Sequence, residues 1–192
     1  MRQYDLDAIT LRNVGEEVDE EQRAELGPAL RGYYNEAYYD LVVNSMKAQR
    51  YEQVSLQQGV LSTDGLEKTL VQLLGVYDKP DYEGGSAYTY VQRGRSSFLV
   101  LGKAPEQVWI KYRYAPDFMD TGNDDAEPTE LPEAYHTLLC TYAAAQHYIT
   151  QRKYASAEQW LQQYYRRAAT LQPQLDNWQM SARNKYPARP GV

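Results

Sequence analysis

Two consecutive apolar stripes with helical spacing occupy the last third of the chain, residues 131–173. The first stripe follows Pro132, and the second resumes after a short basic turn at Arg152 and Lys153. Proline suits the first turn of a helix, and basic residues suit its last turn. Because the connecting turn is short, the two helices must lie antiparallel. The segment therefore predicts a helical hairpin, whose alanine run at 143–145 allows a neighbouring helix to approach closely.

Helical spacing also runs through residues 9–51, near the start of the chain. An acid-rich stretch before Leu26 favours the beginning of a helix. Gly27 and Pro28 then predict a break, after which a second apolar stripe begins at Leu30. This half of the chain is expected to form two helices.

The middle of the chain, residues 51–118, changes from helical spacing to alternation and is rich in β-branched and aromatic residues. The clearest strand covers residues 108–114 and is bounded by Pro105 and Pro116. Four or five short strands are expected here. The predicted fold class is α+β: a helical bundle of about four helices with an inserted small antiparallel β-sheet or sandwich and an extended C-terminal tail.

A chain of 192 residues is long enough to bury one sizeable core. The patterns divide it into five parts: an N-terminal helical half (1–52), a β-rich insertion (53–118), an acidic loop (119–131), a C-terminal helical hairpin (132–172) and an extended tail (173–192).

Tyrosine is strongly enriched, with nineteen tyrosines against two phenylalanines. Tyrosine is frequent at protein interfaces, because its ring packs against apolar groups while its hydroxyl forms a hydrogen bond. Semi-buried tyrosines inside a monomer explain the enrichment equally well. The net charge of −6 argues against a dedicated nucleic-acid-binding protein.

The charge is distributed unevenly along the chain. Residues 115–135 contain seven acids and no base, whereas bases outnumber acids after position 151. This asymmetry favours head-to-tail contact between copies or with a partner. The acidic stretch predicts a flexible negative loop, which would repel phosphate and let DNA slide past without sticking.

The sequence contains few residues suited to chemistry. His136 and Cys140 lie one helical turn apart and could contact one metal ion, but His147 is too far along the helix to join them. Packing explains these residues better. The sequence lacks the residues that phosphate-binding, nucleophile-elbow and calcium-loop motifs require at their defining positions. We therefore predict no catalytic, metal-binding or cofactor-binding residue, no cofactor and no enzymatic activity. The single cysteine and the absence of a long apolar run predict a soluble cytoplasmic chain without a membrane segment.

The order of these parts, together with two local motifs, resembles a known family. The motif YRYAP at residues 112–116 precedes the acidic loop, and LPEAYH at residues 131–136 opens the alanine-rich helix. Over residues 9–170 the chain resembles the phage head-to-tail adaptor (connector, head-completion) proteins.

This resemblance implies a structural protein of the virion neck, assembled in the host cytoplasm. It implies a ring, usually of about twelve copies, beneath the portal protein and above a tail or neck protein. The ring would surround the DNA exit channel and let double-stranded DNA pass without specific binding or any membrane. The C-terminal segment would dock on the portal, with Trp178, Arg183, Lys185, Tyr186 and Arg189 as contacts. The acidic loop would face the channel through Asp120, Asp124, Asp125 and Glu127.

A helical protein-interaction scaffold is the alternative. Tyr148, Tyr154 and Ala157 partly match a tetratricopeptide unit. One copy is present, however, where about three are needed for a stable array.

Overall fold

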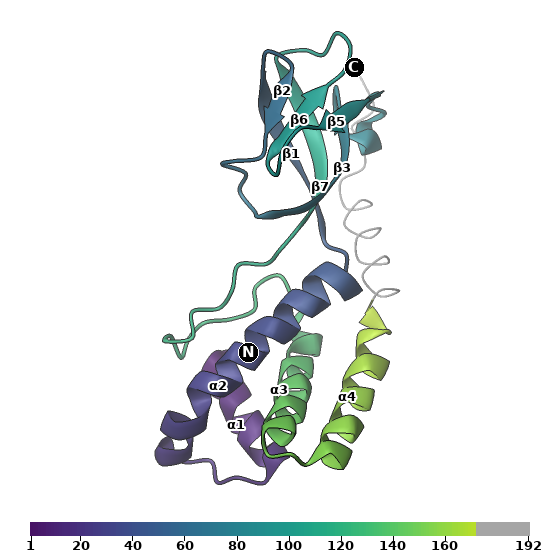
Figure 1. Ribbon diagram of the computed structural model, residues 1–192. Coiled ribbons are helices and arrows are strands. Elements are labelled where there is room, and N and C mark those ends of the chain that lie inside the picture. The colour runs from purple at the N-terminus through teal and green to yellow at the C-terminus, as the bar shows by residue number, and fades with distance from the viewer. Residues whose placement is uncertain (172–192) are drawn as a thin grey trace, which may run out of the picture. The chain divides into compact units, whose positions relative to one another are not determined.

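The computed structural model describes residues 1–171, which fold as two compact units (Figure 1). The helical unit contains Met1–Met46 and the chain from Phe118 onward, and the β unit contains Lys47–Asp117. Each unit has its own buried core.

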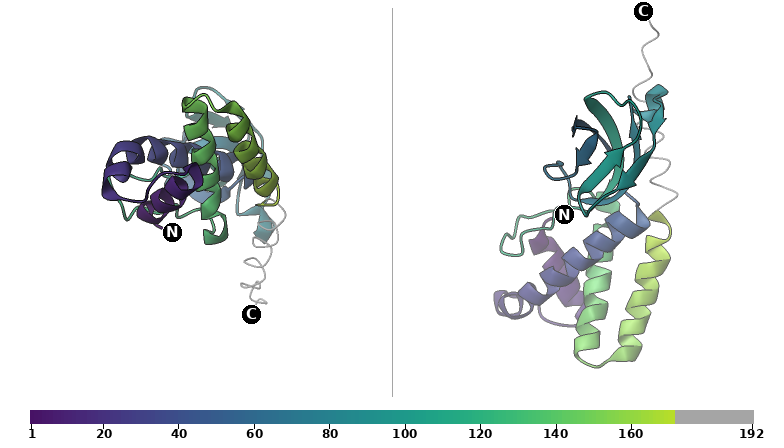
Figure 2. Two further views of the ribbon diagram at one scale, coloured as in Figure 1. Left: turned by 90° about the horizontal axis from the view of Figure 1, so that it is seen from below. Right: turned by 45° about the horizontal axis from the view of Figure 1, so that its top comes forward.

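The helical unit is built around one central helix. Its elements are α1 (Gln3–Val14), α2 (Glu20–Tyr39), α3 (His136–Thr150) and α4 (Tyr154–Ala168). The helix α2 continues into a π-helical turn, η1 (Asp40–Ser45), and a 3-10 turn, η3 (Glu133–Tyr135), leads into α3. The helices α1, α2 and α4 all pack against α3 (Figures 1 and 2).

Small side chains let the neighbouring helices approach α3. Ala143, Ala144 and Ala145 have no exposed surface, and Leu138 and Leu139 beside them are equally buried. A run of three alanines covers much of the circumference of a helix, so it can face more than one neighbour. The alanine run therefore accounts for the central position of α3.

The expected break at Gly27 and Pro28 is wrong, because both residues lie inside α2. An interior proline removes one backbone hydrogen bond and costs about 3 kcal/mol in an isolated helix. Here the same helix buries Leu30, Tyr34 and Tyr38 almost completely. Burial of side chains of this size contributes more than that cost, at about 1.5–3 kcal/mol each.

The β unit is one seven-stranded antiparallel sheet in the order β4-β3-β7-β1-β2-β6-β5. The strands are β1 (Gln49–Gln57), β2 (Val60–Ser62), β3 (Leu70–Tyr77), β4 (Ala87–Tyr88), β5 (Tyr90–Gln92), β6 (Ser97–Val100) and β7 (Gln107–Tyr114), and a 3-10 turn, η2 (Asp81–Glu83), follows β3. The two edge strands, β4 and β5, are consecutive in the chain and are separated by Thr89 alone. One bent segment therefore pairs with both ends of the sheet and brings it close to a closed barrel.

This architecture contradicts the predicted fold class, because the chain is not a helical bundle with a small inserted sheet. The barrel-like sheet has its own core, in which Leu61, Val76, Val108, Ile110 and Tyr112 are fully buried. The prediction failed because β2, β4 and β5 are two or three residues long. Strands this short show no readable alternation, and the pairing of β2 with β6 joins residues far apart in the sequence.

Within the described part of the chain, residues 1–171, no helix combines the length and the apolar character needed to cross a bilayer.

The packing of α3 predicts the effect of enlarging one alanine. Ala144→Leu should lower the free energy of unfolding by about 1–3 kcal/mol, because a closely packed core has no room for three more carbon atoms. Ala155→Leu is the matched control, since Ala155 is exposed on α4. Thermal unfolding followed by circular dichroism should show a lower midpoint for the first variant and little change for the second. Equal midpoints would contradict the close packing around α3.

Candidate functional site

The acidic loop, residues 119–131, is attached to α1 by backbone hydrogen bonds and to α2 by a side-chain amide. The amides of Gln3 and Tyr4 donate to the carbonyl oxygens of Ala126 and Asp124, at 2.9 and 3.1 Å. At the start of the loop, the side-chain amide of Asn35 binds both backbone groups of Met119, at 2.9 Å each. These hydrogen bonds tie the loop to both helices, a feature that the expected flexible loop did not include.

Arg31 of α2 joins the loop to α1 through a buried ion pair. Its Nε and Nη2 atoms donate to Oδ2 of Asp7 at 3.1 and 2.8 Å. The same guanidinium donates to the carboxylate of Asp124 and, at 2.8 Å, to the carbonyl oxygen of Thr121. The Asp7 side chain has no exposed surface, and that of Arg31 is 13% exposed. A planar fork of five N–H donors suits such a crowded set of acceptors.

Burial determines the electrostatics of this pair. It raises the pKa of Asp7, and the hydrogen bond and charge of Arg31 act against that rise. Burial also disfavours the charged form of Arg31, but its hydrogen bonds to Asp7 and Asp124 raise its pKa above the ordinary value. Arg31 consequently stays charged, and its charge is what makes a buried carboxylate at Asp7 tolerable.

The outer acids of the loop are mostly paired but remain exposed. Asp125 lies 3.2 Å from Nη1 of Arg2, and Glu127 lies 3.7 Å from the amino group of Met1. Asp120 accepts a hydrogen bond from the backbone amide of Gly122 at 2.9 Å. The side chains of Asp124, Asp125 and Glu127 are 62%, 75% and 50% exposed. The loop thus presents carboxylates to solvent from fixed positions, with a negative charge that nearby cations reduce.

The end of the loop is fastened by Tyr38 and His136. The backbone amide of Glu130 donates to the hydroxyl of Tyr38 at 2.9 Å, and that hydroxyl donates to the Glu130 carboxylate. Nε2 of His136 lies 2.7 Å from the carbonyl oxygen of Leu131, and Nδ1 lies 3.1 Å from the Met1 amino group. A neutral imidazole that donates through Nε2 and accepts at Nδ1 satisfies both contacts. Burial lowers the pKa of His136, which favours this neutral form.

The cysteine and the two histidines, which were the candidates for metal binding, lie in the core. Cys140 is fully buried, and burial raises the pKa of its thiol to about 12, so the reactive thiolate is suppressed at neutral pH. His136 and His147 are also buried. Residues 1–171 contain no group of three or more side chains able to hold a metal ion.

The predicted portal contacts Trp178, Arg183, Lys185, Tyr186 and Arg189 lie outside the described residues. The sequence reasoning missed Asp7 and Arg31. A signal was present, because Gln3, Leu6, Asp7, Thr10 and Leu11 recur at helical spacing and are all buried. A carboxylate on such a face requires a cation on the helix opposite.

A family model of the SU10 adaptor protein matches residues 8–187, which is nearly the whole chain. The chain belongs to the SU10 adaptor protein family. It is therefore a phage structural adaptor, and the resemblance to head-to-tail adaptors is confirmed. No individual curated protein matched this adaptor.

The Arg31 contacts predict a large loss of stability when the guanidinium is removed. Arg31→Met should lower the free energy of unfolding by about 3–5 kcal/mol, because Asp7 would keep a buried charge without a partner. Arg2→Met is the control, since it breaks the exposed pair with Asp125 and should cost about 0–1 kcal/mol. Urea unfolding of both variants measures the difference. Equal losses would show that the buried pair does not hold the loop.

The burial of His136 and His147 predicts that the protein loses stability in mild acid. Burial lowers the folded-state pKa of His136 and of His147, so the unfolded chain takes up protons first as the pH falls. The stability that these neutral histidines contribute is complete above the unfolded-state pKa of about 6.5. It is lost as the pH falls from there through the lower folded-state pKa. His136→Gln should therefore show a smaller drop in unfolding free energy between pH 7.5 and 5.5 than the parent, measured by urea titration. An unchanged drop would exclude His136 as a source.

Proposed function

We propose that this adaptor forms a ring beneath the portal, joins the capsid to the tail and surrounds the DNA exit channel. The family match over residues 8–187 is the observation that carries the proposal. The anchored loop supports it, because an adaptor acts through surfaces held at fixed positions. A ring of about twelve copies is the stoichiometry that we propose.

We further propose that the acidic loop faces the passing DNA through Asp120, Asp124, Asp125 and Glu127. The exposure of these carboxylates supports this role. Their pairing with Arg2 and Arg31 leaves a moderate negative potential. Such a surface repels phosphate gently, and carboxylates already occupy its two arginines.

The C-terminal segment is proposed to dock on the portal, with Trp178 and Tyr186 as aromatic anchors and Arg183, Lys185 and Arg189 as charged contacts. Twelve such contacts on one ring would act together, so each single contact can be weak. The tail or neck protein would bind the opposite end of the ring.

Mixing with purified portal protein tests the proposed function. Electron microscopy should show added rings on the portal, and their rotational symmetry gives the copy number. A variant ending at Leu171 should lose docking but keep the unfolding midpoint of the parent, because it keeps all the described core residues of the helical unit. Rings that survive the truncation would refute the docking assignment. A parent chain that adds no density to the portal would refute the proposed function itself.

A further inference from the structure

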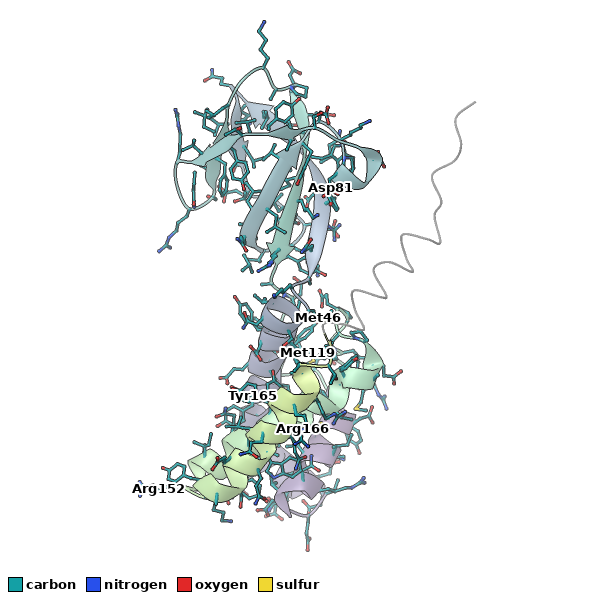
Figure 3. The ribbon with its side chains drawn as sticks, turned by 90° about the vertical axis from the view of Figure 1, so that its right-hand side faces the viewer. Met46, Asp81, Met119, Arg152, Tyr165 and Arg166 are labelled. Atoms are coloured by element: carbon teal, nitrogen blue, oxygen red, sulfur yellow. The ribbon has the colours of Figure 1, made fainter. Side chains whose placement is uncertain are left out.

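The outward face of α4 has no covering element among the described residues. The helix packs on α3 through Ala157, Tyr164 and Ala168, all of which are buried. On the uncovered side, Tyr154 and Tyr165 are 65% and 60% exposed, which makes them two of the most exposed large apolar side chains of the described chain. In Figure 3, where α4 faces the viewer, Tyr165 is labelled at one edge of the helix.

This face is also basic. Arg152 and Lys153 stand just before α4 and Arg166 on it, against one acid, Glu158. Arg167 turns instead to α3, where it donates to Oγ1 of Thr137 at 3.1 Å. Figure 3 shows Arg166 on the body of the helix and Arg152 at its beginning. Neither of these two forms an ion pair with any residue in the range 1–171. Exposed tyrosine combined with arginine is the composition that protein interfaces favour.

A complementary surface lies where α1 connects to α2, at residues 16–25. We call this segment the acidic corner, and its acids are Glu16, Glu17, Asp19, Glu20, Glu21 and Glu25. Its one base, Arg23, is already engaged, since it lies 3.1 Å from Glu20 and stacks 3.7 Å above the ring of Tyr4. Glu17, Asp19, Glu20, Glu21 and Glu25 are exposed. The acidic corner therefore carries a strong uncompensated negative charge.

Along most of α4 the two surfaces lie on opposite sides of the helical unit. Figure 1 and the view from below in Figure 2 both place α3 between α4 and the start of α2. The surfaces approach each other only where α1 ends and α4 begins, because the charges of Glu16 and Lys153 both act on His147. A contact that joins two different surfaces is heterologous, and its repetition gives a ring when the rotation between neighbours closes.

We infer that the α4 face of one copy docks on the acidic corner of a second copy. The exposed tyrosines supply the apolar contact, and the arginines face the glutamates of the neighbour. This inference rests on the proposed ring and names the surfaces that build it. Because the charges at both surfaces are exposed, they steer association and make it sensitive to salt.

Paired charge reversals test this contact in the full-length chain. Arg152→Glu with Arg166→Glu reverses the charge of the α4 face, and Glu17→Lys with Glu21→Lys removes most of the negative charge of the acidic corner. Analytical ultracentrifugation at low salt should show association of the parent that 500 mM salt abolishes. Each double variant alone should associate at least tenfold more weakly, and an equimolar mixture of the two should recover the association.

Matched reversals on the β unit control for net charge. Arg93→Glu with Lys103→Glu, and Glu83→Lys with Glu106→Lys, alter four exposed residues outside both surfaces. These variants should associate as the parent does, and circular dichroism should confirm that all variants are folded. The inference is overturned if the parent stays monomeric at low salt, if a surface variant associates like the parent, or if the mixture shows no recovery.

The portal experiment separates this inference from the proposed function. If the two surface variants still form complete rings on the portal, the function stands and the contact is wrong. If the parent forms no ring on the portal while the reversals behave as expected in solution, the contact stands and the proposed function is wrong.

Discussion

The buried ion pair between Arg31 and Asp7 is the interaction on which the helical unit depends. One guanidinium connects α1, α2 and the acidic loop, and it lies where water cannot replace it. A loop of this composition has few apolar side chains with which to attach itself, so hydrogen bonds must hold it. The consequence for function is mechanical, because exposed carboxylates are kept at defined positions on the surface of a structural adaptor.

The β unit depends on strand pairing, and the described residues at its centre include no ion pair of this kind. Its edge strands are consecutive in the chain, so one short segment pairs with both ends of the sheet. The pairing at each end is short, because β4 pairs with only Val76 and Tyr77 of the eight residues of β3. The sheet therefore depends on its longer pairings, β7 with β1 and with β3, and on the core that they enclose.

Membership of an adaptor family and the two charged surfaces of the helical unit both suit a protein that acts by binding other proteins. The described residues offer buried thiol and imidazole groups with suppressed reactivity and a set of charged, aromatic surfaces. Such a protein works by placing surfaces, so its variants should be judged by assembly and stability. The uneven charge visible in the sequence is distributed in the fold between the start of α2, which is acidic, and α4, which is basic.

The sequence by itself determined the helical hairpin, the buried alanine run, the position of the acidic loop and the family. These are local features, because amphipathic spacing, a proline-led helix start and a run of acids are all read from neighbouring residues. Only the tertiary structure decided the barrel-like sheet, the continuity of α2 through Pro28 and the anchoring of the loop by Arg31. Each of these depends on contacts between residues far apart in the chain: β7 pairs with β1 and β3, α2 packs against α3, and Arg31 reaches Asp7 and Asp124. Local patterns carry no record of such partners, so burial and hydrogen bonding in the folded chain settled them.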